Sequence, residues 1–299
     1  MMADKEEQIM SGGTRRRVVA LVQARLGSTR LPGKMLLPVH ALPLRDWVLH
    51  RVSRAKLLDA VVLATTTEPR DDALAEHVAA LGFPVFRGPE NDVLERFRQA
   101  GLWAGASHVV RVCADNPLIW GGAIDRLIET YFVLAEGNAP GKAGGESYGI
   151  GAPDDCGAAA ASSPGADGAA VPDSAPPAPH ACAPDALPDS LYVYNHIPRN
   201  NLYPDGLGAE MVSYALLEEL AARAVIPAHR EHCFSFIWDN PQLFSIQTFD
   251  PAEPSLRRPD IRLDIDTMED YQRMSRLPVQ PDSTPEEIVR AYDAVFVAH

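Results

Sequence analysis

The 299-residue sequence contains little positive charge, few cysteines and no long apolar run. Its 27 Lys and Arg residues are outnumbered by 40 Asp and Glu residues, so the formal net charge is −13, which argues against nucleic acid as a partner. No apolar run reaches the ~18 residues that a membrane helix needs, and the first residues lack the apolar core of a signal peptide. The four cysteines have no C-x-x-C spacing, which predicts neither a zinc site nor a disulfide framework. We therefore expect a cytoplasmic protein with no nucleic-acid or membrane partner.

Two widespread nucleotide-binding motifs are absent as well. A P-loop has the pattern G-x-x-x-x-G-K-[ST], but Gly27 and Gly33 are one residue too far apart for it. Lys34 is followed by Met35 instead of a hydroxyl residue that could hold Mg²⁺. Because no G-x-G-x-x-G is present, a Rossmann-type dinucleotide site is not expected either.

Residues 18–34, VVALVQARLGSTRLPGK, hold the most distinctive pattern in the chain. The apolar, β-branched run 18–22 predicts a buried strand, and the loop after it combines three cations with hydroxyls and glycines. Ligands of open α/β sheets bind at the carboxyl ends of strands. Glycine lets the backbone approach a phosphate, while Arg and Lys neutralise its charge. The loop therefore predicts an anion site, for which polyphosphate is the favoured ligand; the alternative is a basic surface loop that merely follows a strand.

The first half of the chain alternates strand and helix patterns. Further apolar runs suited to strands lie at 60–65, 84–86 and 108–113, and helical spacing occurs at 44–55, 74–81, 92–104 and 124–131. This alternation predicts an α/β fold with a three-layer, mostly parallel sheet. Asp92 is expected to cap its helix.

The chain divides into an arm, an insertion and one domain. Residues 1–16 are polar and charged and predict a disordered arm. Residues 136–190 are rich in Ala, Gly, Pro and Ser, so they cannot bury enough apolar surface to fold and predict a disordered insertion. We expect 17–299 to form a single domain interrupted by this insertion.

Order is expected to resume after the insertion. Residues 191–195 are the first ordered segment, a short strand is expected at Glu210, and further strands are predicted at 243–248 and 262–266. Helices are predicted around 216–220, over 229–241, after Thr267 as the cap, and after Thr284, where T-P-E-E fits a capping box.

One carboxylate that follows a predicted strand is a candidate metal ligand. Asp115 comes directly after the strand at 108–113 and is expected at the sheet's carboxyl edge, beside the basic loop. An acid near a polyphosphate requires a cation between them, and Mg²⁺ is the usual one. Asp264 and Asp266 alternate along 262–266 and would share one face. The alternative for Asp115 and Asp266 is helix capping.

The pattern A-R-x-G-S-T-R-L-P-G-K resembles the N-terminal signature of the cytidylyltransferases that activate acidic sugars. These include the CMP-KDO and CMP-sialic acid synthetases, and the resemblance is closest to the SpsF branch, named after a spore-coat polysaccharide biosynthesis protein. Further matching segments, in the same order, are D-V-L-E-R from Asp92, A-D-N-P around Asp115, P-D-G-L-G-A-E ending at Glu210, R-E-H from Arg230 and R-L-D-I-D-T-M-E-D around Asp266. Asp264 departs from the neutral residue usual at its place, which leaves open whether Asp264 or Asp266 reaches the metal.

This resemblance implies a nucleotide-diphospho-sugar-transferase fold and a reaction. CMP would pass from CTP to an acidic or related sugar with release of pyrophosphate, in polysaccharide or glycan biosynthesis. Arg25, Lys34 and Asp115 would be catalytic, and Mg²⁺ would bind Asp115 and Asp266. The residues implied at the nucleotide are Gln23, Ala24, Arg25, Gly27, Ser28, Thr29, Arg30, Lys34 and Thr65. Those implied at the sugar are Glu210, Arg230 and His232, although a structural role is an equal alternative for the R-E-H segment.

Two other function classes stay open. A non-catalytic nucleotide- or sugar-binding protein would share the loop without the chemistry. A glycosyltransferase of related fold would use a D-x-D metal motif, which Asp264–Ile265–Asp266 fits. The oligomeric state is also open, a homodimer being one option.

Overall fold

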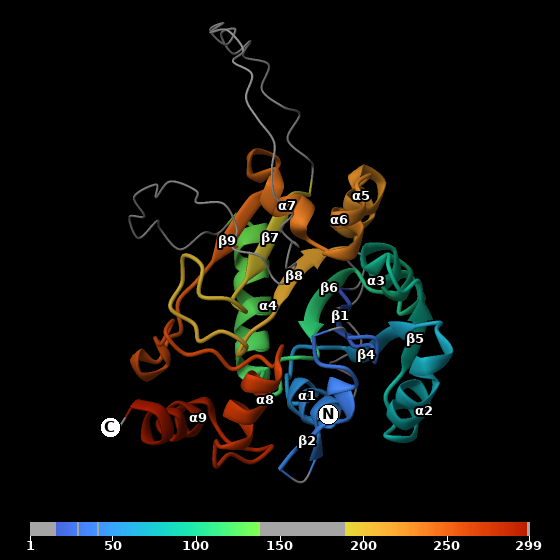
Figure 1. Ribbon diagram of the computed structural model, residues 1–299. Helices are drawn as coiled ribbons and strands as arrows, with labels where there is room; N and C mark the ends of the chain where they lie inside the picture. The colour runs from blue at the N-terminus through green and yellow to red at the C-terminus, as the bar shows by residue number, and fades with distance from the viewer. Residues whose placement is uncertain (1–15, 29, 41, 138–188, 298–299) are drawn as a thin grey trace, which may run out of the picture.

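A seven-stranded β-sheet forms the centre of the computed structural model, which describes residues 16–28, 30–40, 42–137 and 189–297 (Figure 1). In spatial order the strands are β5 (Val85–Gly88), β4 (Ala60–Thr66), β1 (Val18–Gln23), β6 (His108–Cys113), β8 (Glu210–Ser213), β7 (Leu191–Tyr194) and β9 (Ser245–Thr248). In this sheet β8 runs antiparallel to β6 and β7, and the other neighbouring strands pair in parallel. The predicted α/β fold with a mostly parallel sheet is confirmed.

Helices cover both faces of the sheet and complete the predicted three layers. One face packs on α1 (Leu44–Val52), α2 (Asp72–Ala80) and α4 (Gly121–Ala135), and the other on α3 (Val93–Trp103), α5 (Tyr214–Arg223) and α7 (Ser235–Asp239). The alternation of β1 explains this, because Ala20 and Val22 belong to the first core while Val19 and Leu21 belong to the second. A central strand buried on both faces needs the continuous apolar run that the sequence shows.

The predicted helix starts are confirmed in detail. The Asp92 side chain accepts a hydrogen bond from the Glu95 N–H and caps α3. Capping boxes begin α8 (Met268–Ser275) at Thr267 and α9 (Pro285–Tyr292) at Thr284. Local side-chain chemistry therefore sets these boundaries.

Two predicted elements differ from the structure. Residues 229–241 form two short helices, α6 (Pro227–Glu231) and α7, because the chain leaves helical geometry at His232 so that Cys233 and Phe234 can be buried in the second core. Residues 262–266 are not a strand: only Arg262 forms a bridge, to Asp205. The extended backbone here bonds to loop residues instead of a neighbouring strand.

The two segments predicted to be disordered lie largely outside the described residues. This holds for residues 1–15 of the arm and for 138–188 of the insertion. Within the described part of the chain, no helix has the length and apolar character needed to cross a membrane.

Candidate functional site

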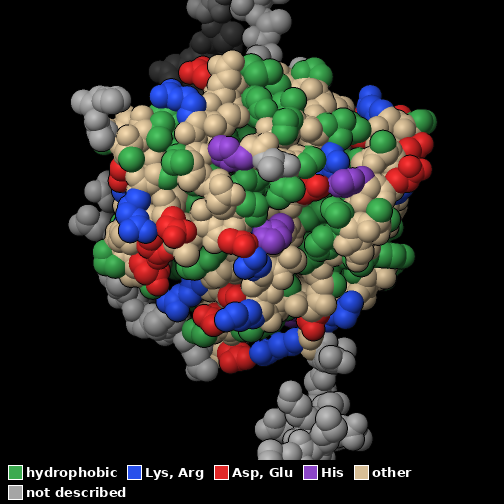
Figure 2. All heavy atoms as spheres, turned by 90° about the horizontal axis from the view of Figure 1, so that it is seen from below, with side chains coloured by type: hydrophobic (Ala, Val, Ile, Leu, Met, Phe, Trp, Pro, Cys, Tyr) green, Lys and Arg blue, Asp and Glu red, His purple; other side chains and the backbone are tan. Residues whose placement is uncertain are grey.

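Strand direction brings the candidate residues to one edge of the sheet. Because β1, β4 and β6 run in parallel, the loops that follow them leave from the same edge. Since β8 is antiparallel to both β6 and β7, β7 ends and β8 begins at that edge too. Figure 2 views the molecule from the side toward which the β6 arrowhead points in Figure 1, and acidic and basic side chains intermingle there.

Lys34 is the centre of a charged cluster at this edge. Its Nζ atom lies 3.3 Å from Asp115 Oδ2, 3.3 Å from Asp266 Oδ1 and 3.2 Å from the Ile265 carbonyl oxygen. Arg30 Nη2 approaches Asp266 Oδ1 at 2.9 Å. The structure therefore brings together four of the residues that the sequence placed in the site, from segments more than 200 positions apart.

The two aspartates of 262–266 share Arg262 but differ in their other partners. Asp264 accepts two hydrogen bonds from Arg262, at 2.6 and 2.7 Å. Asp266 lies 3.5 Å from the same guanidinium and also contacts Lys34 and Arg30. The backbone explains how Asp266 arrives there, because the Ile265 N–H donates to the Asp115 carbonyl at 2.9 Å.

Acidic charge accumulates around this cluster. Burial, and next the carboxylate of Asp264, raise the pKa of Asp205 from 3.8 to about 7, and Asp115 and Asp266 add to the effect. Burial by itself would lower the pKa of Lys34. The charges of Asp115 and Asp266 outweigh this effect and raise the pKa above its ordinary value. Lys34 therefore stays charged between two carboxylates.

The basic loop is held by a buried acid that the sequence did not single out. Asp71, which is fully buried, accepts a hydrogen bond from the Leu26 N–H at 2.7 Å and another from the Thr66 hydroxyl. A Cβ atom on Gly27 would lie 3.0 Å from both the Arg70 guanidinium and the Glu90 carboxylate, so a larger residue here would have to displace this ion pair.

Arg25 extends from the loop toward acidic neighbours. Its guanidinium lies 3.8 Å from the Glu90 carboxylate and 3.9 Å from that of Glu231, the last residue of α6. The R-E-H segment is thus adjacent to the loop through Glu231. Ser28 Oγ accepts from the Leu31 N–H at 3.3 Å, and Thr29 lies outside the described residues.

Other predicted site residues are buried or bonded to protein groups, and the buried Thr65 hydroxyl has no hydrogen-bond partner among the described residues. Thr65 is fully buried in β4, and Ala24 is 4% exposed. Arg230 binds Asp92 at 2.7 Å and the Ala221 carbonyl at 2.6 Å, which ties α6 to α3 and α5. His232 is exposed just after α6.

Glu210 belongs to a buried polar network. Its carboxylate pairs with Arg111 on β6, and it accepts the hydroxyl hydrogen bond of Tyr192. Arg111 also donates to Gln23 Oε1 at 3.1 Å, and His196 Nε2 lies 3.9 Å from Glu210 Oε2. Arg111 and His196 were not predicted from the sequence, although the cation inside the apolar strand VVRVC is a signal for Arg111.

The donor set suits a divalent cation that keeps other ligands. No group of three or more His, Cys, Asp or Glu side chains suited to a metal occurs among the described residues. Asp115 and Asp266 nevertheless supply hard carboxylate oxygens within 3.3 Å of one ammonium. Mg²⁺ typically binds one or two carboxylates together with substrate phosphates and water, so these residues fit such an ion.

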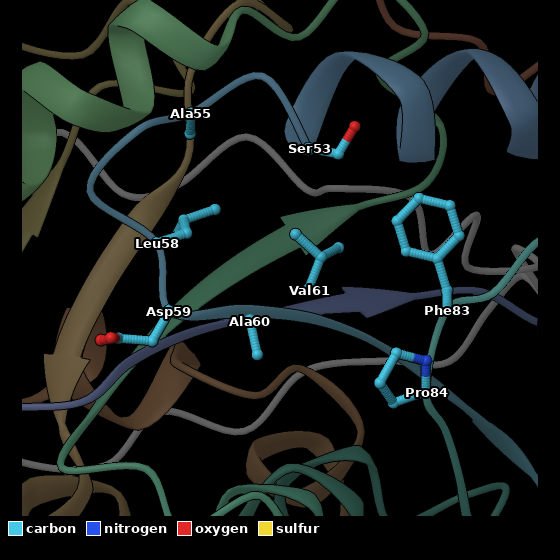
Figure 3. A pocket seen from close by; sticks show the side chains of 8 residues that line it. All are labelled: Ser53, Ala55, Leu58, Asp59, Ala60, Val61, Phe83 and Pro84. Carbon is cyan, nitrogen blue, oxygen red and sulfur yellow. The ribbon is translucent and has the colours of Figure 1, made fainter.

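A hollow elsewhere on the surface lacks comparable chemistry. It is lined mainly by apolar residues at the amino ends of β4 and β5, including Leu58, Phe83 and Pro84 (Figure 3). Its one carboxylate, Asp59, accepts the Val18 N–H at 2.8 Å. This hollow lies at the opposite edge of the sheet from Lys34.

The chain is similar to known proteins in sequence and in structure. Residues 19–139 match the family model described as cytidylyltransferase. The chain is 28% identical to the spore coat polysaccharide biosynthesis protein SpsF of Bacillus subtilis, across 91% of this chain and 92% of that protein. It is 35% identical to a 3-deoxy-manno-octulosonate cytidylyltransferase of Geobacter sulfurreducens, across 37% of this chain and 44% of that protein.

A solved structure extends the likeness to the fold. A cytidylyltransferase from Leptospira borgpetersenii superposes with a TM-score of 0.68 at 23% identity, covering 94% of this chain and 95% of that one. Together, these comparisons confirm the resemblance predicted from the motifs: the chain is related to the cytidylyltransferases of the SpsF and CMP-KDO synthetase type.

Proposed function

We propose that this protein transfers CMP from CTP to a hydroxyl of an acidic or related sugar and releases pyrophosphate. The observation that carries the proposal is the contact of Lys34 with both Asp115 and Asp266, at the edge where the glycine-containing loop ends. A loop that only binds phosphate needs only the cations. Nucleotidyl transfer also needs carboxylates that face the loop and can hold a metal ion. The proposal is also supported by the relationship to 3-deoxy-manno-octulosonate cytidylyltransferases.

The reaction requires positioning and charge neutralisation more than covalent chemistry. The sugar oxygen forms a bond to the α-phosphorus while the bond between that phosphorus and the bridging oxygen to the β-phosphate breaks, so pyrophosphate leaves. In our assignment, Arg25, Arg30 and Lys34 bind the triphosphate, and loop N–H groups near Gly27 contact it. Lys34 is suited to this work because its ammonium is already oriented by two carboxylates.

Asp115 and Asp266 are the residues we assign to Mg²⁺, and Asp264 is not. The ion would neutralise phosphate charge and stabilise the pyrophosphate leaving group. Asp264 is bonded to Arg262 through both carboxylate oxygens and does not contact Lys34, whereas Asp266 contacts Lys34 and Arg30. Release of Lys34 from the two aspartates on nucleotide binding would free their oxygens for the cation.

A pyrophosphate-release assay tests the function. Each of the four nucleoside triphosphates is supplied with Mg²⁺ and a panel of acidic and neutral sugars. We expect release with CTP and at least one acidic sugar, and none without an acceptor. No release with any combination would refute the enzyme assignment in favour of a binding protein. Consumption of a preformed nucleotide sugar with release of the nucleotide would instead favour the glycosyltransferase alternative.

Matched variants test the residue assignment. Asp115→Asn and Asp266→Asn should each lower kcat by at least ~100-fold. Each substitution removes one of the two carboxylate charges assigned to Mg²⁺ at the point where the phosphoryl group is transferred. Asp264→Asn is the control, since it makes the same change two residues from Asp266 but outside the Lys34 cluster. Lys34→Ala should also abolish turnover. Equal losses in Asp264→Asn and Asp266→Asn would contradict our choice between them.

A further inference from the structure

A polar belt crosses the sheet from the end of β1, beside the basic loop, over β6 to β8 and β7. We define it as Gln23, Arg111, Glu210 and His196, which come from β1, β6, β8 and the residue pair after β7. Arg111 and Glu210 are direct cross-strand partners, and Arg111 Nε donates to Gln23 at 3.1 Å. His196 follows β7 at the same edge as Asp115, and its ring lies 3.9 Å from Glu210.

The belt lies where a second substrate has to bind. The basic loop occupies the carboxyl ends of β1 and β4, and Asp115 follows β6 in the middle of the sheet. In-line attack requires the acceptor on the opposite side of the α-phosphate from the leaving pyrophosphate. Since the basic loop is on one side of Asp115, the ends of β8 and β7 are on the other. The belt is the polar part of that second side.

Exposure separates the members of the belt. The side chains of Arg111 and His196 are 17% and 18% exposed, whereas that of Glu210 is 4% exposed. Both carboxylate oxygens of Glu210 are engaged, by Arg111 and by the Tyr192 hydroxyl. Glu210 therefore orients Arg111, and the two partly exposed side chains are the ones that a ligand can reach.

The belt is electrically balanced. The positive charge of Arg111 is matched by Glu210, whose pKa stays below its ordinary value because Arg111, and His196 when it is protonated, outweigh the effect of burial. Burial lowers the pKa of His196 and outweighs the opposing charge of Glu210, so the ring is largely neutral at pH 7. The belt thus offers hydrogen bonds without net charge.

We propose that Arg111 and His196 bind hydroxyl groups of the acceptor sugar, and that Glu210 is a positioning residue for Arg111. This inference rests on the proposed function and differs from the sequence-based prediction, in which Glu210 contacts the sugar directly. The substrate class is a polyhydroxylated sugar recognised here by hydrogen bonding. Any carboxylate that the sugar carries is bound outside the belt.

The test measures pyrophosphate release while the acceptor concentration is varied at saturating nucleotide. His196→Gln and Arg111→Lys should each raise the acceptor KM by ~5- to 30-fold, which corresponds to the loss of one or two hydrogen bonds, and leave the nucleotide KM within about 2-fold. His108→Gln is the matched control: this histidine is also partly buried with a burial-lowered pKa, but it lies at the amino end of β6. It should leave both KM values unchanged.

A second variant tests the charge balance. Glu210→Gln removes the negative charge and leaves Arg111 uncompensated. The variant should therefore gain a preference for a carboxylate-bearing acceptor over its neutral amide, by ~3-fold or more relative to wild type. Glu210→Gln with no change in this preference would overturn the positioning role. Thermal unfolding of each variant shows whether it is folded before its kinetics are compared.

Failure of the two proposals can be told apart. If the wild-type protein releases pyrophosphate but the acceptor KM is unchanged in both His196→Gln and Arg111→Lys, the belt is structural and this inference is wrong. If both variants raise the nucleotide KM instead, the belt belongs to the nucleotide side and the inference is also wrong. If the wild type releases no pyrophosphate with any nucleotide and acceptor, the proposed function and this inference are both refuted.

Discussion

Replacing Asp205 by Asn should stabilise the protein, and the gain should depend on pH. Asp205 has a pKa of about 7 in the folded chain, against 3.8 as its ordinary value, because burial and three neighbouring aspartates disfavour its charge. The difference between these values corresponds to at most ~4 kcal/mol of unfolding free energy. Solvent screening at this partly buried carboxyl lowers our expectation to ~1–3 kcal/mol.

The sign follows from proton binding. Below pH 3.8 the carboxyl is protonated in both the folded and the unfolded chain, so the variant and the wild type should be equally stable. As pH rises toward about 7, the unfolded chain has lost the proton that the folded chain still holds, and the wild type loses stability. The advantage of Asp205→Asn should therefore grow from about pH 4 and level off above about pH 7.

Urea unfolding followed by circular dichroism, at pH 5, 6, 7 and 8 with EDTA present, measures this advantage. Glu76→Gln is the control, because it removes one exposed carboxylate from α2, and its effect should be small at every pH. Adding Mg²⁺ should shrink the advantage of Asp205→Asn, since a cation at Asp115 and Asp266 would relieve the repulsion. A pH-independent difference, or destabilisation above pH 7, would refute the reasoning.

Three further predictions concern the loop and the fold. Asp71→Ala removes the acceptor for the Leu26 N–H and the Thr66 hydroxyl. It should lower the free energy of unfolding, measured with urea, by ~2–3 kcal/mol. It should also weaken nucleotide binding, measured by calorimetry, by ~10-fold. Gly27→Ala places a Cβ atom 3.0 Å from the neighbouring ion pair, so nucleotide affinity should fall with little change in stability; unchanged affinity would show that the ion pair yields. Thr284→Ala removes the cap of α9 and should cost ~1 kcal/mol of stability while pyrophosphate release stays at the wild-type rate.

The parts of the fold that the sequence predicted are those set by neighbouring residues. The run 18–22 is apolar at every position because β1 is buried on both faces, and the T-P-E-E sequence forms its capping box from four adjacent residues. Residues 262–266 show where prediction from neighbouring residues fails. Their alternation is that of a strand, and the side chains of Ile261, Leu263 and Ile265 are buried, but strand formation requires a partner that lies elsewhere in the chain. The partners here are loops at Asp205 and Asp115.

In the candidate site, too, features set by neighbouring residues were predicted and those that depend on distant partners were not. The loop and Asp115 were predicted from their places after apolar segments, and Asp266 from the resemblance of its segment to the family motif; the structure brings Lys34 into contact with both acids. Their roles stay predictions. The commitments of Arg230 to Asp92 and of Glu210 to Arg111 could not be predicted, because each depends on which helix or strand packs alongside. A charged residue in a motif reveals its own chemistry but not the partner that neutralises it.

Strand β6 connects the two halves of the proposed site, and its register determines both. Val110 and Val112 face one core, while Val109 faces the other on the same side as Arg111. A slip of one residue would turn Arg111 into the apolar layer under α4 and draw Asp115 away from Lys34. Pairing with β1 through six residues and with β8 through four fixes that register. The loop that would bind the triphosphate and the belt that would bind the sugar are therefore aligned by the same strand. A substitution that shifts β6 should impair the binding of both substrates. A substitution within the loop or within the belt should impair the binding of one substrate only.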